Sequence, residues 1–156
     1  MVSLIETLVA TAISALLVAS LAGYSLAQRP YAIRAAVQNV GALLSDARSV
    51  AETSGNGATV VIASTTGGFS ASLYPFRPTT GANVGTPPVR SVGGNVIVTS
   101  TAIFVSSSGT VSSTSWSPAG GTLAAEPPCT TPIAITFTSG SSSETHTIPC
   151  ETAELR

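Results

Sequence analysis

The sequence predicts an α+β fold: a long N-terminal α-helix with an apolar first half, packed on an antiparallel β-sheet head. Two observations lead to this prediction. Residues 1–54 have the composition and periodicity of one helix, apolar over 1–28 and amphipathic over 29–54. From residue 55 onward, short β-branched runs alternate with turns rich in Gly, Ser and Pro. The second part, residues 55–156, is long enough for one modest hydrophobic core.

The first segment, MVSLIETLVATAISALLVASLAGYSLAQ, carries no charge between Thr7 and Gln28. As a helix those 22 residues would be about 33 Å long, enough to cross a hydrocarbon core of about 30 Å. A secretory signal peptide would carry Lys or Arg ahead of a shorter apolar core, whereas here only Glu6 precedes it. An ionisable group at the edge of an apolar span is costly without a partner. Two interpretations follow: a simple membrane anchor with Glu6 at the headgroup level, or a segment in which Glu6 has a specific partner.

The second segment, residues 29–54, should continue as a helix with one buried face. Pro30 is expected to kink it or to open one backbone hydrogen bond. Apolar residues then recur at steps of three and four, and Arg48 and Glu52 lie one turn apart off this stripe. The run Ser-Gly-Asn-Gly at 54–57 should end the helix. The stripe consists of Ile33, Val37, Val40, Leu44, Ala47 and Ala51.

The head should contain six or seven strands, joined by turns at Gly67–Gly68, at Gly109 and at residues 140–143. Two stretches, 77–94 and 117–128, are expected to be loops. The residues from 95 to 107 fit either one bent strand or two. The expected strands cover 58–64, 69–76, 95–100, 102–107, 110–116, 132–139 and 144–150.

The two cysteines, Cys129 and Cys150, flank the last expected hairpin. In an exported domain such a pair is most simply a disulfide, and the alternative is two unpaired buried thiols. Metal binding needs more ligands than two Cys and the single His146 supply.

Composition argues against most other functions. Charged residues make up 8% of the chain and the net charge is −1, so specific nucleic-acid binding is not expected. His146 is the only histidine and Asp46 the only aspartate, and they lie far apart in the sequence. We therefore expect no catalytic site and no cofactor. Trp116 and Tyr74 are expected to be core or subunit-contact residues rather than ligand platforms.

The run Val-Ser-Leu-Ile-Glu, from Val2 to Glu6, followed by Thr-Leu-Val-Ala-Thr-Ala-Ile-Ser, resembles the start of a mature type IV pilin or type II secretion pseudopilin. In that family a short basic leader is removed after a Gly, so this chain would be the processed form. The family's Glu usually falls fifth in the mature chain and is sixth here. The mature N-terminus could therefore be Met1 or Val2.

A second passage, AIRAAVQNVGALLSDARSVAETSGNGATVVI at residues 32–62, is similar to the helix-to-first-strand region of the H-type minor pseudopilins and related minor pilins. The spacing Leu-x-x-Ala-Arg-Ser-x-Ala, from Leu44 to Ala51, carries that similarity. The resemblance covers residues 1–62, and beyond them only the strand-rich layout agrees. It does not distinguish a major from a minor subunit.

The resemblance implies a pilin-like fold and a structural role in an extracellular type IV pilus-like filament, which we expect to contain this chain as its major subunit. The alternative is a minor pilin or pseudopilin of a type II secretion or DNA-uptake system. Implied partners are other copies of the chain, the inner membrane before assembly, a prepilin peptidase and the assembly machinery. Implied assembly residues are Glu6, the amine of Met1 or Val2, and Pro30, where the helix loosens in family members. A C-terminal disulfide like Cys129–Cys150 is also common there.

Overall fold

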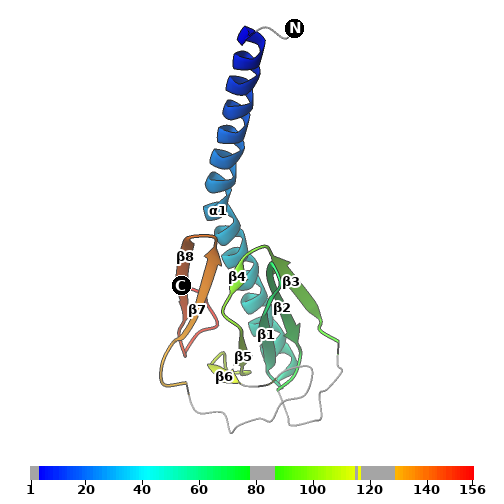
Figure 1. Cartoon of the computed structure of the whole chain (residues 1–156). Coiled ribbons are helices and arrows are strands. Elements are labelled where there is room, and N and C mark those ends of the chain that lie inside the picture. The colour runs from blue at the N-terminus through cyan, green and yellow to red at the C-terminus, as the bar shows by residue number, and fades with distance from the viewer. Residues whose placement is uncertain (1–3, 78–86, 115, 117–128) are drawn as a thin grey trace.

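The computed structural model describes residues 4–77, 87–114, 116 and 129–156, and the fold is α+β. One long helix, α1 (Leu4–Ser54), runs through the molecule, and its residues 28–54 pack on two antiparallel sheets (Figure 1). The helix continues through Pro30 and ends at Ser54, as the sequence predicts. Beyond it, Gly55 and Gly57 have φ angles of 69° and 81°, and the Gly55 amide donates to the Ala51 carbonyl at 3.1 Å.

The head contains two sheets rather than the single sheet expected. In the five-stranded sheet the order is β3-β2-β1-β5-β6, and in the three-stranded sheet it is β4-β7-β8. All pairings are antiparallel, including the two hairpins β1–β2 and β7–β8 that the sequence predicts. The strands are β1 (Ala58–Thr65), β2 (Gly68–Tyr74), β3 (Arg90–Gly94), β4 (Ile97–Val98), β5 (Thr101–Val105), β6 (Val111–Thr114), β7 (Ile133–Ser139) and β8 (Ser142–Ile148).

One detail of the strand prediction is wrong. The expected loop at 77–94 ends in strand β3, which pairs with β2 at the edge of the larger sheet. Its sequence, Arg-Ser-Val-Gly-Gly, has one apolar residue, so no alternating pattern marks it. For residues 95–107, where one bent strand or two were expected, the structure has two strands, β4 and β5, and they belong to different sheets. Residues 78–86 of the first expected loop and the whole of the second, 117–128, lie outside the described residues.

The core lies between α1 and the two sheets. Five of the six predicted stripe residues are fully buried and Val37 is partly buried. Ala36 and Leu43 are buried as well, so the apolar face of the helix is wider than the stripe. This is because α1 contacts strands of both sheets, β1 and β3 of one and β7 of the other. From the strands, this core includes Val60, Ile62, Ile135 and Phe137.

A smaller aromatic cluster lies apart from this core. The ring of Trp116 packs edge-to-face on Tyr74 and Phe76, with centroids 5.0 Å and 5.4 Å apart. Both Trp116 and Tyr74 are buried, which confirms that they are packing residues. Burial raises the pKa of the Tyr74 phenol, an effect only partly offset by its contact with Ser72.

Candidate assembly surface

The described residues 8–20 of α1 are all exposed, although most of them are apolar; we call them the exposed apolar segment. Leu16 is 72% exposed and Val18 68%, whereas Leu44 on the same helix is fully buried. The apolar side chains of this segment point in all directions around the helix axis. A helix that is apolar all round is normally surrounded by other apolar groups.

The hydroxyl groups of the segment do not interrupt its apolar character. Thr11 Oγ1, Ser14 Oγ and Ser20 Oγ each donate to a main-chain carbonyl three or four residues earlier, at 2.8–3.0 Å. Their donors are therefore satisfied within the helix, as they must be in an apolar environment. The segment presents hydrocarbon to any neighbour.

Within the part of the chain that the structure describes, no helix combines the length and the hydropathy that crossing a membrane requires.

Three of the four predicted assembly residues lie outside this description. Met1 and Val2 lie outside the described residues, as does the side chain of Glu6, whose backbone belongs to α1. Pro30 is exposed within α1, at the point where the helix enters the head. The pairing of Glu6 with an N-terminal amine therefore stays a prediction.

The junction between the exposed apolar segment and the head involves Arg29, a residue that no sequence motif marks. Its Nη1 donates to Ser141 Oγ at 3.3 Å, in the turn between β7 and β8. At the neighbouring Gly140, whose φ is 60°, an added Cβ would lie 2.7 Å from Arg29 Cζ. The turn thus rests on the Arg29 guanidinium, a contact between residues 112 apart in sequence, for which only tertiary structure supplies a signal.

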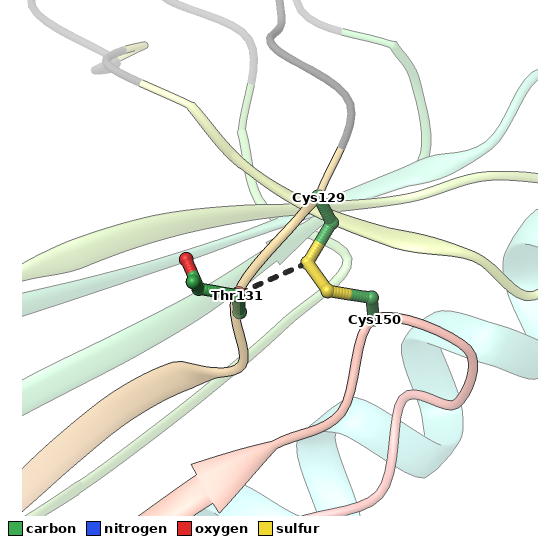
Figure 2. The surroundings of a disulfide bond; sticks show 3 residues. All are labelled: Cys129, Thr131 and Cys150. Atoms are coloured by element: carbon green, nitrogen blue, oxygen red, sulfur yellow. Dashed lines mark hydrogen bonds between the residues drawn. A yellow bond between two sulfur atoms is a disulfide. The ribbon is translucent and has the colours of Figure 1, made fainter.

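The predicted disulfide is present. Cys129 and Cys150 are bonded, 21 residues apart, and close the chain around the β7–β8 hairpin (Figure 2). Cys129 Sγ lies 3.2 Å from the carbonyl oxygen of Thr131, which we regard as a polar contact because a disulfide sulfur carries no hydrogen. The Cys150 carbonyl accepts from the Val111 amide at 2.9 Å, which links the hairpin to β6 of the larger sheet.

The residues weighed for catalysis have separate partners. Asp46 forms an ion pair with Arg90, on the side of α1 that faces β3. His146 lies on β8, edge-to-face with Phe137, and its Nε2 is 3.6 Å from Glu144 Oε2. Over the described ranges, no three His, Cys, Asp or Glu side chains gather where they could hold a metal ion. The structure does not bring these residues together into a site.

Comparison of the chain with protein-family models, curated proteins and solved structures found no match. The resemblance of residues 1–62 to pilins therefore rests on the motifs alone.

Proposed function

We propose that this chain is a structural subunit, and the major one, of an extracellular type IV pilus-like filament. The observation that carries the proposal is the exposed apolar segment, which is helical, apolar on every side and free of outward-pointing hydroxyl donors. It would lie in the inner membrane before assembly and in the filament core afterwards.

Leaving this segment in water carries a large free-energy cost. Burial of one Leu or Val side chain contributes about 1.5–3 kcal/mol, and Leu8, Leu16 and Val18 are each more than half exposed. A single partner helix would cover one side only. Neighbours on every side are supplied by a bilayer or by a bundle of identical helices, and a heterologous contact repeated without closure produces a filament.

Glu6 would set the axial position of a new subunit. In a helix bundle its carboxylate would lie in a medium of low dielectric, where an unpaired charge costs several kcal/mol. No cation occurs from Thr7 to Gln28, so the nearest is a main-chain amine, of Met1 or Val2, in the same or an adjacent subunit. A charge pair in apolar surroundings disfavours alternatives in which the subunit has slipped along the axis.

The second candidate is a minor pilin or pseudopilin of a secretion or DNA-uptake system. The resemblance of Leu44–Ala51 to H-type minor pseudopilins favours it. A third, a monomeric domain tethered to the membrane, would use the same helix without assembling.

The proposal is tested by producing the chain as the only filament subunit in cells that have a prepilin peptidase and an assembly machinery. Electron microscopy and mass spectrometry of sheared material should show uniform filaments composed mainly of this chain. Absence of filaments would contradict the role of major subunit. In cells that also produce another filament subunit, incorporation of this chain as a trace component would then favour the minor subunit, and no incorporation the tethered domain.

Glu6→Gln sharpens the test, because it keeps the side-chain shape and removes the charge. We expect normal membrane insertion and a sharp loss of filaments. The matched control is Glu52→Gln, which removes an exposed carboxylate from the second half of α1 and should assemble normally. Wild-type filament yield from Glu6→Gln would show that Glu6 has no part in assembly.

A further inference from the structure

The end of the head from which the exposed apolar segment emerges differs in composition from the segment itself; we call it the stalk end. Strands β1, β3 and β7 finish there, so that three turns border the helix (Figure 1). The first two turns touch, because a Cβ added to Gly68 would collide with the Gly94 carbonyl. The third rests on Arg29. The stalk end comprises residues 29–34 of α1 and the turns at 65–68, 93–95 and 140–143.

The three turns contain only Gly, Ser, Thr and Asn, whereas the helix contributes two cations, Arg29 and Arg34. Along α1 the next charge after Arg34 is Asp46, twelve residues or about 18 Å further from the apolar segment. Glu144 is the nearest carboxylate on β8; it borders the same cavity of about 310 Å³ as Arg34 and offsets part of that charge. Of the described side chains here, the cations outnumber the acids, so the stalk end is weakly positive.

There is no spacer between the apolar run and the head. Gln28 is the last residue of the uncharged run, and Ile33, five residues later, is fully buried in the core. Five helical residues advance about 7.5 Å, which is about the depth of one headgroup layer. Tyr31, within this interval, is 69% exposed, and Tyr is a side chain typical of the membrane–water interface.

We propose that, before assembly, the stalk end binds the anionic phosphate headgroups of the bilayer that holds the helix. This inference rests on the proposed membrane-anchored state. Arg29, whose position is held by the β7–β8 turn, and Arg34 face the phosphates, while Tyr31 lies at the interface. The small residues of the turns allow the head to approach the lipid closely. The lipid contact fixes the height and tilt of the head on the membrane.

The test uses the full chain in phosphatidylcholine vesicles, with or without phosphatidylglycerol. A fluorophore on Thr66→Cys reports the stalk end, and one on Ser107→Cys, in the turn between β5 and β6, reports the opposite end; both positions are exposed. Lipids with a spin-labelled headgroup quench a nearby fluorophore. We expect Thr66→Cys to be quenched several times more strongly than Ser107→Cys, with the difference increased by phosphatidylglycerol and reduced by salt.

Charge variants separate a lipid contact from simple proximity. Arg29→Gln and Arg34→Gln should each lower the equilibrium constant of the contact roughly fivefold, since one basic residue near an anionic surface contributes about that factor. Arg29→Lys keeps the charge and should retain the dependence on phosphatidylglycerol. Arg77 follows the end of β2 that lies away from the stalk end. Arg77→Gln removes one positive charge there and should have no effect on the lipid contact.

Flotation of the vesicles distinguishes failure of the membrane-anchored state from failure of the lipid contact. A chain that does not float with the vesicles would overturn both the anchored state and the lipid contact. If the chain floats but the two fluorophores are quenched equally, the lipid contact alone is overturned. The same holds if the chain floats and the quenching does not depend on phosphatidylglycerol.

Discussion

The two halves of α1 are continuous in backbone but opposite in environment. Leu16 is 72% exposed and Leu44 is fully buried, although both lie in the same 51-residue helix. The second half has an apolar face and a polar face, and its own head covers the apolar one. The described part of the first half is apolar all round, and none of the other described residues covers it. Within the described residues, the head therefore supplies a complete environment for one half of the helix and not for the other.

The largest difference between the two halves of α1 is expected in the free energy of unfolding after a matched Leu→Ala substitution in each half. Leu44→Ala removes a fully buried side chain and should lower the free energy of unfolding of the head by about 2–5 kcal/mol. Leu16→Ala should leave it unchanged, because Leu16 has no contact with the head to lose. Urea unfolding in mild detergent, followed by near-UV circular dichroism, measures both. Equal destabilisation by the two would mean that the first half is part of the head's cooperative unit.

Removal of the disulfide should affect the head alone. The bond joins two residues that are 21 positions apart in the sequence. On the chain-entropy model, the double variant Cys129→Ala, Cys150→Ala should therefore lose roughly 3 kcal/mol in the free energy of unfolding. Mass spectrometry of the unreduced wild-type protein must first find no free thiols. Far-UV circular dichroism of the double variant in detergent should still show the helical signal. Loss of that signal would show that helix α1 depends on the disulfide-stabilised head, which would contradict an effect on the head alone.

Gly140→Ala tests the junction between the halves. Gly140 has a φ of 60° and an added Cβ would lie 2.7 Å from Arg29 Cζ, so we expect a loss of about 1–2 kcal/mol. Gly41→Ala is the control, since a Cβ there meets nothing within 4 Å and the helix should gain up to about 1 kcal/mol. Thermal unfolding compares them. A Gly140→Ala variant as stable as wild type would show that the turn can move off Arg29 at little cost.

The smallest effect is expected for an ion pair on the covered half. Arg48 Nε lies 2.9 Å from Glu52 Oε1, with both side chains about half exposed, so Glu52→Gln should cost less than about 0.5 kcal/mol. The cost should disappear in high salt. A cost of several kcal/mol would indicate that this face of the helix is covered, and that the contrast between its two faces is weaker than the exposures suggest.

By itself, the sequence determined the features that depend on neighbours along the chain. The apolar run, the stripe on α1, the glycine turn after Ser54 and the two predicted hairpins follow from periodicity and turn chemistry. The disulfide follows from two cysteines flanking one hairpin. The candidate assembly surface could likewise be predicted from the apolar run, because exposure there requires only that nothing else in the chain cover it.

Only the tertiary structure decided the features that join distant residues. The division into two sheets separates β4 from β5, although two residues lie between them. Ala36 and Leu43 are buried because both sheets flank the helix. Arg29 meets the turn at Gly140, and Asp46 meets Arg90, across 112 and 44 residues. No local pattern marks such pairs, since each polar residue has the same sequence signature whether it ends in solvent or against a distant partner.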